Sequence, residues 1–183
     1  MNHKRQGQRG FVAFSCRDPY TRRVTESYVT NTGWSSPASI PPADPKGPGD
    51  FNDRIIDEYR ANGGKLGGMF AGSDLLLLHH TGGQSGTARV SPLAYQRIGN
   101  SYAIFASRAG SAANPDWFNN VVASPETVIE VGRDRLAVRA RVAQPAERDV
   151  IWDRQKKRVP QFAEYERKAA PRKIPVIVLD PVK

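Results

Sequence analysis

Cysteine and histidine are scarce in this sequence of 183 residues, which holds one cysteine, Cys16, and three histidines. A lone cysteine cannot form an intrachain disulfide, and it cannot supply the paired thiolates of a structural zinc site. Two of the histidines, His79 and His80, are neighbours in an expected strand, where successive side chains point to opposite faces and do not readily share one ion. We therefore predict no metal site, and the lack of cysteine pairs is typical of a reducing compartment.

Long apolar runs are also missing. The longest aliphatic run, Leu75–Leu78, is far shorter than the ~20 residues of a membrane-spanning helix. An apolar run near the start, Phe11–Phe14, is too short for a signal peptide. We therefore predict a cytoplasmic protein. The sequence also lacks the Gly-x-Ser-x-Gly elbow of serine hydrolases and the Gly-Lys-Ser/Thr ending of a P-loop, which argues against both classes.

Positive charge is what the chain has in excess. Lys and Arg number 27 against 18 Asp and Glu, a formal net charge of +9. This balance favours anionic partners: nucleic acid, anionic lipid, or a small molecule that carries phosphates and carboxylates. The segment Arg154–Lys173 interleaves basic residues with Phe162 and Tyr165, a pattern that suits single-stranded nucleic acid. More often such a face is solvated, with its aromatic rings turned to the core or to a pocket.

The chain divides near residue 50. Residues 1–50 show little periodicity and end in the Pro- and Gly-rich stretch Ile40–Gly49, so we predict a disordered or extended segment with a linker. From residue 51 to 183 the pattern indicates one domain. It predicts helices over 50–62, from 114 to about 124, over 145–158 and over 161–168, and strands over 75–80, 89–98, 101–107, 127–131, 136–142 and 174–179. Antiparallel hairpins with inserted helices favour an α+β fold, mainly β, built as a closed or half-closed barrel.

Three places in this pattern carry candidate chemistry. The glycine-rich loop Gly82–Gly86, followed by Arg89, can turn backbone amides toward an anion, although an ordinary hairpin turn has the same composition. Arg108 precedes a predicted helix start at Asn114-Pro115-Asp116, where Asn caps, Pro takes the first helical position and the helix dipole favours an anion. Trp117 and Asn120 share one face of that helix and suit a flat polar ring, although core packing is the commoner role of a tryptophan.

Several ordered blocks in residues 51–181 resemble the deazaflavin-dependent nitroreductase family of actinobacteria. They include Ile56-Asp-Glu-Tyr-Arg-Ala-Asn-Gly-Gly64, Leu76-Leu-Leu-His-His-Thr-Gly-Gly-Gln-Ser-Gly86, Arg89-Val-Ser-Pro-Leu93, Ala106-Ser-Arg-Ala-Gly110, Asn114-Pro-Asp-Trp-Phe-Asn-Asn120 and Ile174-Pro-Val-Ile-Val178. Each block is common on its own, but the ordered set is specific. The resemblance implies a split β-barrel of antiparallel strands with flanking helices.

The resemblance also implies the coenzyme F420, with FMN less favoured, and assigns a site. F420 has a tail of phosphate, lactyl carboxylate and glutamates, which suits a basic chain. The coenzyme-binding residues carried over are Gly83, Gln84, Ser85, Arg89, Val90, Ser91, Pro92, Leu93, Phe105, Ala106, Ser107, Arg108, Asp116, Trp117, Phe118, Asn119 and Asn120. The residues carried over for the substrate are Ala94, Phe162 and Tyr165, and the catalytic candidates are Ser107 and Tyr165.

The chain departs from the family pattern at several of these positions. Gly83 and Gln84 stand where relatives often have basic residues, and Arg108 stands where lysine is usual. Ala94 and Phe162 stand where some relatives have tyrosine, so the acceptor is less defined than the coenzyme.

The function implied is hydride transfer from reduced F420 to an organic acceptor such as a quinone, a nitro-compound or an activated alkene. Two other hypotheses stay open on the residues alone. A carrier that binds F420, another flavin or haem without turnover has the same fold requirements, and a binder of nucleic acid or anionic membrane has the same charge. Association with a membrane surface would bring the protein near lipid quinones, and the oligomeric state is left open.

Overall fold

The computed structural model describes residues 48–83 and 85–182. The prediction for the N-terminal segment lies outside these residues, except at its end. Helix α1 runs over Pro48–Ala61, so the last residues of the predicted linker already belong to this helix. It ends near the predicted place, because the Gly64 N–H donates to the carbonyl of Tyr59 in a C-terminal turn.

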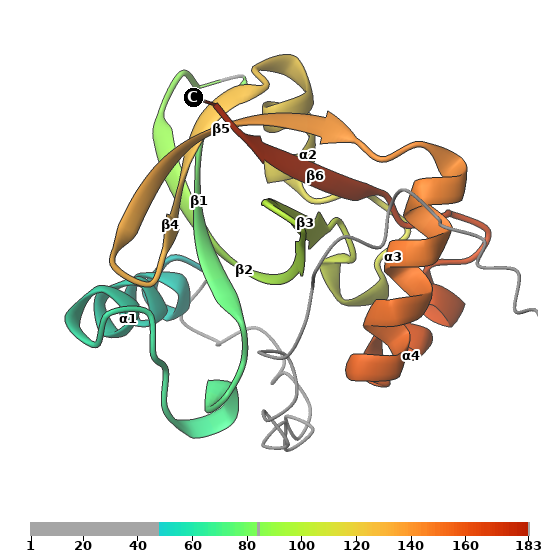
Figure 1. Cartoon of the computed structure of the whole chain (residues 1–183), viewed down its shortest axis with the longest axis horizontal. Helices are drawn as coiled ribbons and strands as arrows, with labels where there is room; N and C mark the ends of the chain where they lie inside the picture. Colours follow the sequence, from blue (N-terminus) through green and yellow to red (C-terminus); the bar gives the residue numbers. More distant parts are fainter. Residues whose placement is uncertain (1–47, 84, 183) are drawn as a thin grey trace, which may run out of the picture. The chain divides into compact units, whose positions relative to one another are not determined.

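Six antiparallel strands close into a barrel in the order β1-β2-β3-β6-β5-β4 (Figure 1). This confirms the predicted split-barrel fold class. The strands are β1 (Leu75–Thr81), β2 (Ala88–Ile98), β3 (Ser101–Phe105), β4 (Glu126–Val131), β5 (Asp134–Val142) and β6 (Val176–Pro181).

Two tight turns set the register of the hairpins. Ile98 pairs with Ser101 around Gly99-Asn100, as predicted, and Gly99 has the positive φ of 56° that such a turn requires. The second turn is shorter than predicted. Val131 pairs with Asp134, so only Gly132 and Arg133 lie between the strands, and the next two residues extend β5.

Strand β1 is buried on both faces. Leu76 and Leu78 point into the barrel core, whereas Leu75 and Leu77 pack against α1 through Ile56 and Tyr59. Because both faces are buried, the start of the strand is a continuous apolar run and not an alternation of apolar and polar residues. Burial of each leucine stabilises the fold by roughly 1.5–3 kcal/mol.

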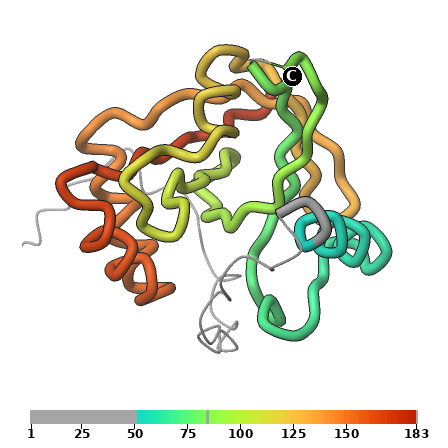
Figure 2. The backbone as a smooth tube through the Cα atoms, turned by 180° about the vertical axis from the view of Figure 1, so that it is seen from behind, coloured from blue at the N-terminus to red at the C-terminus, as the bar shows by residue number. Residues whose placement is uncertain are grey.

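The other helices cover the barrel at separate places, as Figures 1 and 2 show. Helix α2 (Asp116–Ala123) packs on β1 and β5. Helices α3 (Pro145–Arg158) and α4 (Gln161–Ala169) pack in a second apolar cluster with residues of β3 and β6. Two single 3-10 turns, η1 (Gly68–Phe70) and η2 (Arg108–Gly110), were not predicted. Within the described residues, no helix has the length and apolarity to cross a membrane.

The start of α2 differs from the prediction. The helix begins at Asp116, and Pro115 is still extended, with ψ at 153°. Asn114 does not cap the helix, because its side-chain oxygen instead accepts a hydrogen bond from Arg172 Nη1 at 2.8 Å. A contact with a distant residue thus replaces the local cap that the motif predicts.

Candidate active site

A pocket of about 260 Å³ opens where the middle of β2 and the end of β3 meet α1, η1 and α4. Its lining is mostly apolar and aromatic. It consists of Phe51, Asn52, Ile55, Met69, Phe70, Ser73, Leu75, Pro92, Leu93, Ala94, Phe105, Ser107, Val159, Gln161, Phe162 and Tyr165. An apolar cavity with a few polar groups is the usual form of a small-molecule site.

The pocket brings together seven of the residues that the sequence assigned to coenzyme or substrate. They come from three separate parts of the chain: Pro92, Leu93 and Ala94 in β2, Phe105 and Ser107 at the end of β3, and Phe162 and Tyr165 in α4. The residues of α1 and η1 that complete the pocket were missed. Nothing in their local pattern marks them, because they face the pocket only after α1 has packed on the sheet.

Tyr165 belongs to the lining of this pocket and is the most buried polar residue in it. Its side chain is 4% exposed, and its hydroxyl has no hydrogen-bond partner among the described residues. Burial raises the pKa of this phenol to about 12, so it stays protonated at neutral pH. An unpaired buried hydroxyl costs roughly 1–3 kcal/mol, a cost that a ligand with an acceptor atom would remove.

Aromatic contacts hold Tyr165 in place. Its ring meets Phe162 edge to face at 5.5 Å, and Phe162 in turn meets Phe105 at 5.2 Å. Trp152 of α3 contacts both phenylalanine rings from behind. Such ring pairs add about 0.5–1.5 kcal/mol each beyond their buried area, so the pocket wall is rigid.

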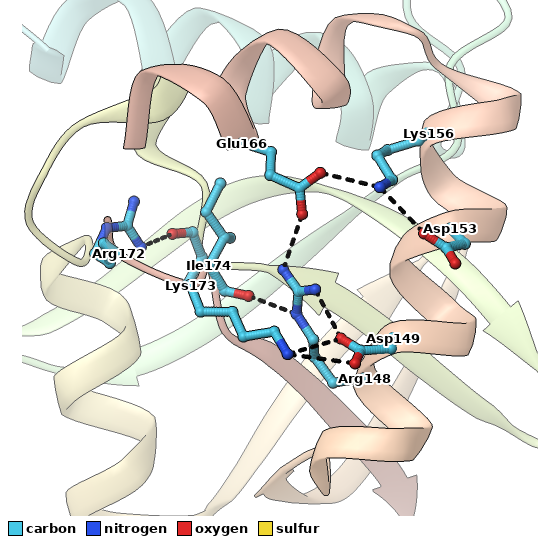
Figure 3. A network of polar contacts seen from close by, with 9 residues as sticks. Arg148, Asp149, Asp153, Lys156, Glu166, Arg172, Lys173 and Ile174 are labelled. Atoms are coloured by element: carbon cyan, nitrogen blue, oxygen red, sulfur yellow. Dashed lines mark hydrogen bonds and ion pairs between the residues drawn. The ribbon is translucent and has the colours of Figure 1, made fainter. Parts of the chain in front are cut away.

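An ionic network fixes α4 to α3 and to the segment before β6 (Figure 3). Arg148 is 6% exposed and donates from Nε to the carbonyl of Ile174 at 3.0 Å. It pairs with Asp149 and lies 3.7 Å from Glu166 of α4, which also pairs with Lys156 of α3. A partly buried network of this kind sets the orientation of α4, and with it the place of Tyr165.

Arg172 holds the loop that carries Ser107 and Arg108. Its guanidinium donates to the carbonyls of Ala106, Ser107 and Ser111 and to the side chain of Asn114. Burial lowers the pKa of Arg172. It forms no ion pair within the described part of the chain, and five acceptor contacts take the place of a carboxylate. In the sequence, Arg172 is marked only as one basic residue among several before the last strand.

A second, more polar groove of about 760 Å³ lies between α1 and β2. Arg89, Val90 and Ser91, all predicted coenzyme residues, form its strand side, and Asn52 belongs to both this groove and the apolar pocket. Asp53 and Asp57 of α1 form the opposite side. The groove therefore has Arg89 on its strand side and charges of both signs on its helix side, where Arg60 stands beside the two aspartates.

The glycine-rich loop is tied to α2. The Gly83 N–H donates to Asn120 Oδ1 at 3.0 Å, and Ser85 Oγ accepts from the Thr87 N–H. Gln84 lies outside the described residues. His80, which sequence reasoning considered only as a metal ligand, contacts both Asn120 and Ser91.

The remaining predicted residues are spread over the α2 region and its approach. Trp117 is 7% exposed and lies in the barrel core with Ala106, and Phe118 packs against that core. Asp116 and Asn119 are exposed. The placement of Trp117 matches the packing alternative, so a coenzyme contact by its indole stays a prediction.

Arg108 is exposed and donates to the carbonyl of Asn114 at 3.1 Å. Its φ of 45° lies in the left-handed region, which places the residue in a strained turn of η2.

The two neighbouring histidines have separate partners, as expected from strand geometry. His79 Nε2 lies 2.6 Å from Glu130 Oε1, and Arg60 binds the same carboxylate with two nitrogens. These bonds, with Arg60 the largest cause, lower the pKa of Glu130 to about 2. In residues 48–83 and 85–182, no three His, Cys, Asp or Glu side chains gather as a metal site would require.

Comparison with known proteins identifies the family. The model of the F420H(2)-dependent quinone reductase family matches residues 53–181. The F420H(2)-dependent quinone reductase Rv1261c of Mycobacterium tuberculosis is 34% identical over 125 residues, which are 66% of this chain and 83% of that protein.

Two solved structures share the fold. The F420-H2 dependent reductase FDR-A has a TM-score of 0.54 and 32% identity, covering 58% of this chain and 94% of that one. A structure described as a domain-swapped dimer has a TM-score of 0.56 and 29% identity, covering 73% of this chain and all of that one. These matches confirm the predicted resemblance: the chain belongs to the F420H(2)-dependent quinone reductase family and is an F420-dependent oxidoreductase.

Proposed function

We propose that this protein transfers a hydride from reduced F420 to a quinone bound in the apolar pocket. The observation that carries the proposal is a mostly apolar and aromatic pocket whose lining includes Tyr165, a buried phenol with no hydrogen-bond partner among the described residues. A quinone has flat apolar faces and carbonyl oxygens at its edges. Its faces can pack against the apolar walls, and a carbonyl oxygen can accept a hydrogen bond from the Tyr165 hydroxyl.

The residues present fit the coenzyme. Pro92, Leu93 and Phe105 offer apolar surface for a ring, and the groove that shares Asn52 with the pocket carries Arg89 and Ser91 for an anionic tail. Neither Arg89 nor Arg108 forms an ion pair within the described part of the chain, so both guanidiniums are open to phosphate or carboxylate. FMN, which also carries a phosphate, remains the less favoured coenzyme.

The protein contributes binding, orientation and exclusion of water. Reduced F420, when bound, supplies the hydride. The pocket walls hold the acceptor in one orientation and keep water from it, which lowers the entropic part of the barrier. Ser107, at the pocket edge beside the Arg172-held loop, is placed to donate a hydrogen bond to a bound ring.

Tyr165 acts as a hydrogen-bond donor to the acceptor. Its raised pKa keeps the proton on the phenol, so it stabilises the negative charge that develops on the quinone oxygen. We assign the transferred proton to solvent. Nitro-compounds and activated alkenes also carry oxygens that develop charge, and the same pocket suits them as alternative acceptors.

A single-atom change tests the role. Tyr165→Phe removes the hydroxyl and keeps the ring contacts, so we expect kcat with menadione to fall roughly 10- to 100-fold while F420 affinity is kept. Tyr102→Phe is the matched control, since its hydroxyl bonds to Arg97 and is outside the pocket lining. The assay follows the return of oxidised F420 absorbance under anaerobic conditions. Binding of F420 without any reduction of menadione would favour a carrier, and equal rates for both variants would remove Tyr165 from the mechanism.

A further inference from the structure

His80 connects three residues that were assigned to the coenzyme on other grounds. Its Nε2 lies 3.0 Å from Ser91 Oγ in β2, and its Nδ1 lies 2.9 Å from Asn120 Nδ2 in α2. Asn120 then accepts the Gly83 N–H through Oδ1 at 3.0 Å. A continuous chain of hydrogen bonds thus runs from β2 through His80 and α2 to the glycine-rich loop.

The backbone amide of Gly83 fixes the direction of every bond in this chain. An amide N–H can only donate, so the Asn120 atom facing it is the carbonyl oxygen, and the Asn120 NH₂ group faces His80. The NH₂ group donates in turn, so His80 Nδ1 carries no proton. Neutral His80 therefore has its proton on Nε2 and donates to Ser91 Oγ.

The surroundings of His80 favour this neutral form. The side chain is 9% exposed at the end of β1. Burial is the largest cause that lowers its pKa, followed by the positive charge of Arg89 in β2 and the neighbouring His79, while Asp116 in α2 acts in the opposite direction. The imidazole is thus neutral at pH 7 and matches the hydrogen-bond chain.

We propose that His80 is a positioning residue for the coenzyme, which holds Ser91, Asn120 and the Gly83 loop in their binding arrangement and releases them when it is protonated. The proposal rests on the proposed function, because it concerns the same coenzyme site. His80 itself need not touch the coenzyme.

Protonation breaks the chain at a defined bond. A proton on Nδ1 faces the Asn120 NH₂ group, and two donors repel each other. If the Asn120 amide turns over to offer its oxygen to His80, its NH₂ group then faces the Gly83 N–H, which is again a donor facing a donor. In the first case His80 loses its bond to Asn120, and in the second the glycine-rich loop loses its bond to α2, so the chain is broken in both. We therefore expect coenzyme affinity to fall as the pH drops below the usual histidine range.

The test measures binding of oxidised F420 by fluorescence titration from about pH 8 to about pH 5, a range that spans the ordinary histidine pKa. For the wild type we expect about a tenfold weaker affinity at the acidic end. His80→Gln removes the titrating group and should show weaker affinity with no pH dependence beyond that of the coenzyme itself. His79→Gln is the matched control on the opposite strand face: it leaves the hydrogen-bond chain intact, so affinity should still fall toward acidic pH, with a midpoint slightly higher because one charge that lowers the His80 pKa is gone. Titration of the coenzyme itself is common to all variants and cancels in the comparison.

A second variant separates positioning from a merely structural role. Asn120→Asp keeps an acceptor for the Gly83 N–H but offers only oxygens to His80, so it favours the protonated imidazole. We expect this variant to keep its affinity toward acidic pH, with the drop shifted or reversed, even if its overall affinity is lower. A profile for His80→Gln that matches the wild type, or one for Asn120→Asp that is unshifted, would overturn the proposal.

A measurement without coenzyme distinguishes failure of the positioning proposal from failure of the proposed function. The Gly83 amide resonance in the NMR spectrum of the free protein should shift with the same pH midpoint as the His80 ring, and should lose this titration in His80→Gln. If that coupling is seen but no variant binds F420 at any pH, the proposed function is wrong and the positioning proposal falls with it. If Gly83 does not respond to His80, the hydrogen-bond chain itself is wrong.

Discussion

Arg172 and His80 are the two residues on which the candidate site most depends outside its own walls. Arg172 holds the loop with Ser107 and Arg108, and His80 holds the glycine-rich loop. Seven of the residues that line the apolar pocket were assigned from the sequence, because their motifs lie in continuous blocks. The roles of Arg172 and His80 were missed, because their partners are distant: Arg172 lies 65 positions from Ser107, and His80 lies 40 from Asn120.

Loss of Arg172 should loosen the loop. Arg172→Met removes five contacts of a charged donor and leaves several carbonyls unpaired, so we expect the free energy of unfolding to fall by roughly 2–4 kcal/mol and F420 affinity to drop about tenfold. Arg167→Met is the control, because Arg167 is exposed and makes only a long ion pair within α4. Urea denaturation and F420 titration measure both effects. An Arg172 variant that behaves like the Arg167 variant would contradict the role of Arg172 in holding the Ser107 loop.

The lowered pKa of Glu130 makes the free energy of unfolding depend on pH. Its pKa in the folded protein is about 2, below the ordinary value of 4.5, mainly because of Arg60. The ionised Glu130 carboxylate therefore stabilises the folded protein fully above about pH 4.5. This contribution is lost as the pH falls toward 2, because the unfolded chain binds the proton more readily. By this linkage the contribution is at most about 3 kcal/mol. Glu130→Gln should flatten the acid limb of stability against pH in urea titrations, and an unchanged limb would show that the ion pair contributes nothing.

Turn η2 and helix α4 lie close together at Gly110. A Cβ atom added there would lie 2.7 Å from Lys168 Cβ and 3.0 Å from the Tyr165 carbonyl oxygen. The glycine has a φ of 85°, so the position needs both a left-handed backbone and the absence of a side chain. This contact joins the Ser107 loop to the helix that carries Tyr165.

Two glycine variants separate the backbone effect from the packing effect. Gly99→Ala has a similar positive φ of 56° with nothing within 4 Å of the added Cβ, and should cost about 1–2 kcal/mol. Gly110→Ala should cost roughly 1–3 kcal/mol more, because the methyl group pushes η2 away from α4. Urea denaturation gives the difference. Equal costs would mean that the approach of the two elements is not tight.

The elements themselves were largely predictable, and the exceptions have physical causes. Periodicity and turn residues predict every strand, and the bounds of α3 are as expected. The start of α2 was wrong because Arg172 competes for the Asn114 side chain. Turns η1 and η2 were missed because single 3-10 turns have too few residues to carry a period.

For the whole molecule, the net charge of +9 should govern coenzyme capture. Because F420 carries an anionic tail, its affinity should fall by roughly an order of magnitude between about 0.05 and 0.5 M salt. Asp53 and Asp57 line the groove opposite Arg89 and oppose this attraction. The double variant Asp53→Asn/Asp57→Asn should bind F420 about two- to fivefold more tightly at low salt, whereas Asp153→Asn on α3 should not. If the affinity for F420 changes neither with salt nor in the aspartate variant, the anionic tail does not bind in this groove.

A variant that fills the apolar pocket tests most directly whether the acceptor binds there. Ala94 lines the pocket and pairs with Leu75, so Ala94→Trp should occupy the space assigned to the acceptor. Ala137→Trp is the control, on an exposed position of β5 outside the pocket lining. The measurement is the anaerobic oxidation of reduced F420 by menadione. We expect kcat/KM for menadione to fall at least about 100-fold in Ala94→Trp, through the loss of the acceptor site, and to stay at the wild-type value in Ala137→Trp. Wild-type turnover in a folded Ala94→Trp variant would show that the acceptor does not bind in this pocket.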